Sequence, residues 1–215
     1  MAEAGRVIAG SARGRRLRAP GEGTRPFGDR VKQTLFAILE PDLPGARVLD
    51  LFAGSGAGGI EALSRGAAAA IFVERDAAAA RVIDENLHAT GLSADARIVR
   101  GDAIAYLKTA ARNGPFDLVL LDPPYAESGL MDAALTCLGS AETALLAPDG
   151  WVVAKHFWRT PPPPAAGLLA SVRYRRFGET ALTFYRWAPE PSPGAGSVED
   201  VTGTDQPAGP QEAAT

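Results

Sequence analysis

The sequence has few of the residues that build disulfides, metal centres or membrane spans. Cys137 is the only cysteine among 215 residues, which excludes an internal disulfide and a cysteine-based zinc site. The only histidines are His88 and His156, which argues against a catalytic metal. No apolar run is long enough to cross a bilayer, and residues 1–16 carry charges where a signal peptide needs an apolar stretch. We therefore expect a cytoplasmic protein without metal or membrane attachment.

Acidic side chains are scarce at the start of the chain and basic ones are absent at its end, although the net charge is only −3. Residues 1–32 carry eight basic side chains against three acidic ones, whereas residues 189–215 carry five acidic side chains and no basic one. Arginine dominates the basic segment and suits bidentate contacts to phosphate. The segment therefore indicates a nucleic-acid backbone as partner, the alternative being a solvated arm without a partner.

The composition fits one ordinary domain with two extensions. Hydrophobic residues make up 46% of the chain, enough to bury a core. The end of the chain is rich in Pro, Gly, Ser and acid, and such a segment cannot offset its ordering entropy by burial. We expect a basic nucleic-acid-contacting extension over residues 1–44, the main domain over 45–188 and a disordered acidic tail over 189–215.

Apolar runs and helical patterns alternate along the main domain. This alternation predicts βαβ units and an α/β fold with a mostly parallel, seven-stranded sheet covered by helices on both faces. The last two strands read as an antiparallel hairpin at the sheet edge. The predicted strands are Arg47–Phe52, Ala69–Glu74, Ala96–Arg100, Phe116–Leu121, Trp151–Ala154, Ser171–Phe177 and Thr180–Trp187. The predicted helices are Gly58–Arg65, Ala77–Thr90, Ala103–Arg112 and Leu130–Leu138.

The basic head predicts a small β-hairpin followed by a helix. Asp29 is the expected N-cap of this helix, which ends near Leu39. Its apolar side chains form one stripe at helical spacing, and we expect Arg30 and Lys32 to lie away from that stripe.

The tetrad Asp122-Pro123-Pro124-Tyr125 ends the apolar run at residues 116–121. A carboxylate accepts a hydrogen bond from an exocyclic amine, and the prolines present carbonyls on a stiff backbone without competing N–H groups. An aromatic ring supplies a face on which a base stacks. The tetrad therefore indicates a binding site for a nucleobase amine rather than an incidental Pro-rich turn.

Carboxylates follow three successive predicted strands. Asp50 precedes the glycine-rich turn at residues 53–59, Glu74 ends the second strand and Asp102 follows the third. In parallel sheets ligands bind at this edge, and the carboxylate about twenty residues after the turn holds ribose hydroxyls. Asp50 would repel a pyrophosphate but could pair with a cation, and Asp102 could accept from an adenine amine. A ligand with an amino group, a ribose and an adenine fits S-adenosylmethionine better than NAD.

These segments resemble a known family. DLFAGSG, GGIEALSRGA, FVERD, GDA and LLDPPY look like a class I methyltransferase acting on nucleobase amino groups. RVIAGSARGRRL and RPFGDRVKQTLFAIL narrow the resemblance to the bacterial small-subunit (16S) rRNA guanine-N2 methyltransferases of the RsmD type. The resemblance covers Arg6 to Trp187. It implies a Rossmann-like fold, transfer of methyl from S-adenosylmethionine to guanosine N2, and ribosomal RNA or an assembling small subunit as partner.

The resemblance also assigns roles. Asp122, Pro123, Pro124 and Tyr125 would hold the target guanine. The residues expected to contact RNA are Arg13, Arg15, Arg16, Arg25 and Arg30. The residues expected to hold the cofactor are Asp50, Phe52, Ala53, Gly54, Ser55, Gly56, Glu74, Arg75, Asp102 and Ala103.

The chain departs from the family pattern at three places. Phe27-Gly28 replaces a small hydroxylic pair, and Lys32-Gln33 replaces a basic–acidic pair. Lys155-His156 stands after the fifth strand, where an acidic residue is common. The last departure leaves open which group lines the far side of the base pocket.

Three alternatives remain open from the sequence. A DNA adenine-N6 methyltransferase can use the same tetrad, although this chain has no large target-recognition domain. A dinucleotide-dependent dehydrogenase shares the glycine turn. An RNA-binding module could keep the fold without the activity. We expect a monomeric enzyme.

Overall fold

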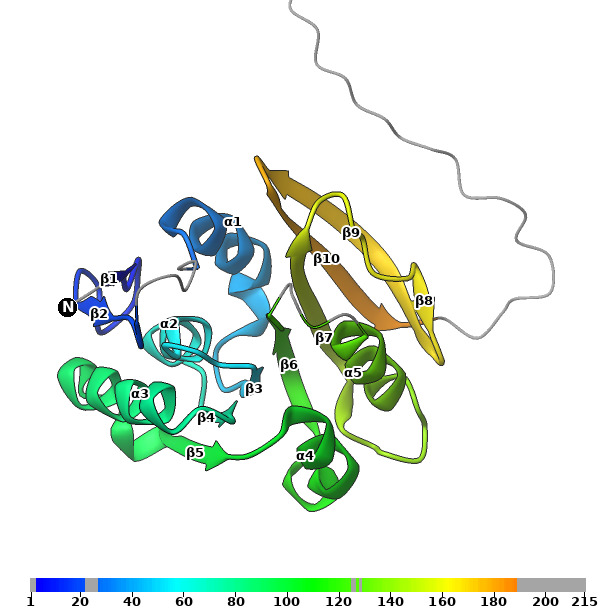
Figure 1. The fold of residues 1–215 in the computed structure, drawn as a ribbon, viewed down its shortest axis with the longest axis horizontal. Helices are drawn as coiled ribbons and strands as arrows, with labels where there is room; N and C mark the ends of the chain where they lie inside the picture. The colour runs from blue at the N-terminus through cyan, green and yellow to red at the C-terminus, as the bar shows by residue number, and fades with distance from the viewer. Residues whose placement is uncertain (1–2, 22–26, 125–126, 128, 189–215) are drawn as a thin grey trace, which may run out of the picture.

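The computed structural model describes residues 3–21, 27–124, 127 and 129–188 (Figure 1). Its central sheet has eight strands in the order β5-β4-β3-β6-β7-β10-β9-β8. Pairs from β5 to β7 are parallel, and pairs from β7 to β8 are antiparallel. The strands are β3 (Arg47–Leu51), β4 (Ala69–Glu74), β5 (Ala96–Arg100), β6 (Phe116–Leu121), β7 (Leu146–Phe157), β8 (Ala165–Ala166), β9 (Leu169–Phe177) and β10 (Thr180–Trp187).

The α/β class and the mostly parallel sheet are confirmed, with two differences in detail. The eighth strand is the two-residue β8, which pairs with the start of β9. Strand β7 is far longer than its apolar segment Trp151–Ala154. Its first residue, Leu146, pairs with Phe116 of β6 and its last, Phe157, pairs with Thr180 of β10. Pairing partners on both sides therefore set its length.

Helices cover both faces of the sheet (Figure 1). Helices α1 to α3 share one hydrophobic core with Phe72 and Phe184, and α4 and α5 share the other with Val119 and Tyr185. Strand β6 is buried on both faces, which explains its continuous apolar run. The helices are α1 (Asp29–Leu39), α2 (Ala57–Ser64), α3 (Ala77–Thr90), α4 (Ala103–Thr109) and α5 (Leu130–Leu138), with 3-10 turns η1 (Glu40–Asp42), η2 (Ser93–Asp95) and η3 (Ala110–Asn113).

The strand order reverses between β3 and β6. The chain first builds outward from β3 through β4 to β5, then returns to place β6 on the other side of β3. The loops after β3 and β6 therefore leave the sheet at the same edge but in opposite directions. Ligands of open α/β sheets bind in the crevice at such a reversal.

The predicted hairpin is present as β1 (Glu3–Arg6) and β2 (Arg16–Arg18). It packs on α2 and α3 through hydrogen bonds that sequence patterns could not show. The buried carboxylate of Glu61 accepts from the backbone N–H groups of Ile8 and Ala9 at 2.8 and 3.0 Å. Asn86 exchanges two hydrogen bonds with the backbone of Arg18. The head thus shares the core of the main domain.

Two expectations for α1 are wrong. Asp29 is the first helical residue rather than the N-cap, because Gly28 holds the extended capping position without a side-chain hydrogen bond. Lys32 is fully buried rather than away from the apolar stripe. Its ammonium donates to the carbonyl of Arg6 and lies 4.0 Å from the Glu61 carboxylate, and burial lowers its pKa. Lys32 therefore links the head, α1 and α2.

Among the described residues, no helix is both long and apolar enough to span a membrane. Nor does that part of the chain bring together three or more His, Cys, Asp or Glu side chains that could hold a metal. The tail over 189–215 lies outside the described residues, so its predicted disorder stays a prediction.

Candidate active site

A cavity of about 770 Å³ opens at the carboxyl ends of β3, β4, β6 and β7. It brings together nine of the ten residues expected to hold the cofactor, and with them Asp122, Pro123 and Pro124. Residues of the head, including Pro20 and Phe27, complete its wall. Tyr125 lies outside the described residues.

Gly56 is the cofactor candidate that does not line the cavity. It caps the N-terminus of α2 with a φ of 76°. A Cβ at this position would meet Ile83, Ile60 and Phe72 at 3.2–3.3 Å, so the residue faces the core. Gly56 therefore shapes the turn, whereas Gly54, at a φ of 56°, lines the cavity.

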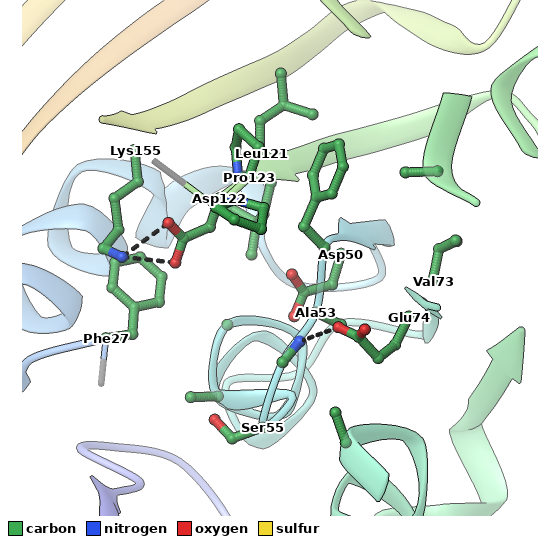
Figure 2. Close-up of a pocket in the computed structure, with 18 of the residues that line it drawn as sticks. Phe27, Asp50, Ala53, Ser55, Val73, Glu74, Leu121, Asp122, Pro123 and Lys155 are labelled. Atoms are coloured by element: carbon green, nitrogen blue, oxygen red, sulfur yellow. Dashed lines mark hydrogen bonds and ion pairs between the residues drawn. The ribbon is translucent and has the colours of Figure 1, made fainter. Parts of the chain in front are cut away.

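Asp50 lies in the middle of the site (Figure 2). Its side chain is buried, and Oδ2 accepts a 2.8 Å hydrogen bond from the N–H of Gly59. Burial raises the pKa of Asp50 to about 7, with a further rise from the nearby charges of Asp122 and Glu74, against a lowering by the Gly59 hydrogen bond. A positively charged group in the cavity would compensate for this burial.

Glu74 fixes the glycine turn from the neighbouring strand. Its Oε2 accepts from the N–H of Gly54 at 2.8 Å (Figure 2), and its Oε1 accepts from the N–H of Asp76 at 2.8 Å. A carboxylate has about four acceptor positions, so two backbone bonds leave capacity for a ligand hydroxyl. The predicted ribose contact therefore remains compatible with this geometry.

Asp102 has a structural role in addition to the predicted one. It is the N-cap of α4, where Oδ1 accepts from the N–H of Ala105 at 2.8 Å. Asp76 caps α3 in the same way and also lines the cavity, a position that the sequence reasoning missed. Arg75 lines the same region, and its Nη1 donates to Glu127 at 2.9 Å. The adenine contact of Asp102 stays a prediction.

Lys155 is the second residue that sequence reasoning did not assign. It lies within β7, and its ammonium is 2.8 and 2.6 Å from the two carboxylate oxygens of Asp122 (Figure 2). The side chain of Lys155 is 8% exposed and that of Asp122 is 32% exposed. The ring centroid of Phe27 lies 5.5 Å from the same ammonium. Two of the chain's departures from the family pattern therefore meet at one point.

The expected RNA-contacting arginines lie on the surface. Arg13, Arg15, Arg16 and Arg30 are exposed, and Arg25 lies outside the described residues. Arg16 pairs with Glu3 at 2.6 Å. In the part of the chain that the structure describes, Arg13, Arg15 and Arg30 form no ion pair. Their charges are therefore available to a polyanion.

Comparison with solved structures identifies the class. The structure of yhhF from Escherichia coli matches with a TM-score of 0.75 and 34% identity, over 87% of this chain and 99% of that one. A hypothetical protein from Thermus thermophilus matches with a TM-score of 0.71 and 32% identity, over 84% and 98%. The protein is a class I methyltransferase in fold, and the cofactor of that class is S-adenosylmethionine.

Sequence comparisons identify the family. A family model described as "Conserved hypothetical protein 95" matches residues 5–186. YlbH of Bacillus subtilis is 43% identical over 183 residues, which cover 84% of this chain and 98% of YlbH. Ribosomal RNA small subunit methyltransferase D of Escherichia coli is 41% identical over 148 residues, which cover 68% of this chain and 69% of that protein. The chain belongs to this family, the RsmD family of methyltransferases, which confirms the resemblance found in its motifs.

Proposed function

We propose that this protein transfers a methyl group from S-adenosylmethionine to the exocyclic N2 amine of a guanosine in small-subunit (16S) ribosomal RNA. The observation that carries the proposal is the shared cavity, where the Asp122-Pro123-Pro124 strand tip faces the residues expected to hold the cofactor. Relatives named ribosomal RNA small subunit methyltransferase D support the substrate class. The DNA adenine alternative receives no support from the comparisons, and membership of a methyltransferase family decides against the dehydrogenase.

The residues of the cavity fit the cofactor. S-adenosylmethionine supplies a methyl group activated by its sulfonium, and it also carries an amino group, a ribose and an adenine. Asp50 would accept a hydrogen bond from the cationic amino group. The positive charge of that group would compensate for the burial that raises the pKa of the Asp50 carboxyl. Glu74 would accept from the ribose hydroxyls and Asp102 from the adenine amine. The apolar side chains of Val73 and Leu121 complete the wall.

Asp122 would position the guanine. Its oxygens accept from Lys155, and the remaining lone pairs can accept from the N2–H group. The carbonyl of Pro123 would accept the second N2 hydrogen. Such bonds favour a pyramidal nitrogen and stabilise the positive charge that develops on it. Methylated N2 then gives up one proton, which Asp122 or solvent takes. Catalysis is therefore mainly alignment of the two reactants.

The head would hold the RNA. Arg13, Arg15, Arg16, Arg25 and Arg30 would contact phosphates, which set position more than sequence. The target base must leave its helix or loop to enter the cavity, and Tyr125 would stack on it. We further propose that the protein acts as a monomer in the cytoplasm, on free ribosomal RNA or on an assembling small subunit.

Transfer of labelled methyl to ribosomal RNA tests the proposal. Purified protein is offered small-subunit RNA, free and within assembled subunits, with DNA as control, and the modified nucleosides are identified by mass spectrometry. We expect N2-methylguanosine from small-subunit RNA. N6-methyladenine in the DNA control, or cofactor binding without transfer to either RNA form, would contradict the proposal.

A further inference from the structure

A tryptophan flanked by two arginines lies just beyond the end of β7. The guanidinium carbon of Arg176 is 3.6 Å from the ring centroid of Trp158, and that of Arg159 is 4.9 Å away. Arg176 comes from the exposed strand β9, which also carries Arg173 and Arg175. Because side chains alternate between the two faces of a strand, Arg173 and Arg175, which pair with Phe184 and Leu182, lie on the face opposite to Arg176. We name Arg159 and Arg176, with Trp158, the β9 arginine surface.

The arginines of this surface have no acidic partner among the residues that the structure describes. Both arginines are exposed, and neither forms an ion pair with any residue that the structure describes. Residues 157–179 contain four arginines, these two included, and one acid, Glu179, which gives the segment a net charge of +3 in a chain whose total is −3. The surface is therefore a local concentration of positive charge.

Stacking on Trp158 prepares the guanidinium groups for an anion. A planar guanidinium that lies over an indole loses side-chain freedom in advance and keeps its N–H donors at the edge of the plane. Arg176 gains a second restraint, because its Nε donates to the carbonyl of Gly178 at 3.0 Å. This fork of donors fits phosphate or carboxylate in a bidentate manner, and phosphate is the anion that the proposed RNA substrate supplies.

The position of the surface relates it to the cavity. Strand β7 ends at the same edge of the sheet as β6, and Lys155, which lines the cavity, lies three residues before Trp158. The basic head contributes Pro20 and Phe27 to the cavity wall from elsewhere in the fold. In Figure 1 the hairpin β1–β2 and the hairpin β9–β10 lie on different sides of the strand ends that hold the site.

We propose that the β9 arginine surface is a second RNA-contacting surface, which binds phosphates on the strand that flanks the target guanosine. With the head on the other side, the RNA would be held at two places while one base leaves its stack for the cavity. This inference rests on the proposed function. Charged side chains also protect edge strands from pairing, but that role does not require arginines stacked on a tryptophan.

The salt dependence of RNA binding tests the proposal. The variant Arg159→Gln/Arg176→Gln removes two charges from the surface. The control Arg97→Gln/Arg112→Gln removes two exposed arginines away from the carboxyl edge of the sheet, Arg97 in β5 and Arg112 before β6. Affinity for free small-subunit RNA and for assembled small subunits is measured between 50 and 200 mM salt, with cofactor affinity as a check on folding. We expect the slope of log K against log salt to shrink by about 1.4 to 1.8 in the first variant and to stay unchanged in the control.

Three results would overturn the inference, and they differ from one another. An unchanged slope in Arg159→Gln/Arg176→Gln, with normal binding by the unmodified protein, would remove the RNA contact but leave the proposed function intact. A loss seen only with assembled subunits, and not with free RNA, would show that the surface binds a protein. Failure of the unmodified protein to bind the RNA at all would contradict the proposed function itself.

Discussion

Lys155 and Asp122 form a two-oxygen ion pair at the wall of the cavity, with distances of 2.6 and 2.8 Å from the ammonium to the carboxylate. The pair joins β7 to the end of β6, and Phe27 of the head packs against it. One contact thus connects the expected catalytic tetrad, the central sheet and the basic head. Because the Lys155 side chain is nearly buried, the pair orients the carboxylate without leaving an isolated charge.

Loss of the Asp122 carboxylate should strongly reduce turnover while leaving cofactor binding intact. We expect Asp122→Ala and Asp122→Asn to bind S-adenosylmethionine normally and to lose turnover by about 100-fold or more, the usual effect of removing a preorganised electrostatic contact. Asp122→Asn is the milder structural change, and Asp122→Ala/Lys155→Met removes both charges of the pair. Single-turnover rates measure the effect. Near-normal turnover in Asp122→Asn would remove Asp122 from the mechanism.

Lys155 should affect catalysis by positioning the carboxylate of Asp122. We expect Lys155→Met to lower kcat by roughly tenfold, because the carboxylate loses its orienting contact, as positioning losses do. Lys155→Arg retains a charged donor and should recover part of the rate. The KM for the cofactor should not change in either variant. Equal loss in both variants, or a rise in cofactor KM with kcat intact, would contradict a positioning role.

Asp50 should make stability depend on pH. Its pKa is about 7 in the folded protein against 3.8 ordinarily, so the folded state holds the proton more tightly. The stability that Asp50 contributes is full below about pH 4 and is lost as the pH rises through about 7, at most roughly 4 kcal/mol. We expect Asp50→Asn to raise the free energy of unfolding at pH 8 relative to the parent, and much less at pH 4. Denaturant titrations at both values measure this.

The same group should link cofactor affinity to pH. A cationic amino group favours ionised Asp50, so binding should release a proton near pH 6.5 and tighten as the pH rises. Calorimetry in two buffers of different ionisation enthalpy counts the proton. Asp50→Asn should bind about tenfold or more weakly and release none. Equal proton release by both proteins would assign the linkage to another group.

The RNA-binding role of the head should be tested by replacing its arginines rather than by deleting the segment. Val7 and Leu17 are fully buried, so removing residues 1–20 would open the core. We expect Arg13→Gln/Arg15→Gln/Arg30→Gln to raise the KM for RNA roughly tenfold or more, because three phosphate contacts are lost, with little change in kcat. The matched control Arg81→Gln/Arg97→Gln/Arg112→Gln changes exposed charges outside the head. Equal KM values in the two triple variants would contradict the assignment.

Local pattern was sufficient for much of the fold. Strands β4, β5, β6 and β10 and helices α3 and α5 begin and end where the sequence pattern places them. Their limits depend on burial on one or both faces and on nearby turn residues, which are visible along the chain. Of the cavity-lining cofactor candidates, Asp50, Glu74, Asp102 and the glycine turn follow from their positions at strand ends, and the others were implied by the family resemblance.

Contacts between distant residues were not visible in the same way. Lys32 appears polar in a helical pattern, but the carbonyl of Arg6 and the carboxylate of Glu61 allow its burial. Phe27 and Lys155 were recognisable only as departures from a family pattern, and their contact depends on the path of the head. The β9 arginine surface requires that the turn between β9 and β10 lie beside the end of β7, which short-range patterning does not specify.

The most direct test of the account is the nucleoside content of small-subunit RNA in cells that lack this protein. We expect one N2-methylguanosine to disappear, to return when the unmodified chain is supplied, and to remain absent with Asp122→Asn supplied at the same level. An unchanged N2-methylguanosine content in cells without the protein, or full restoration by Asp122→Asn, would contradict it.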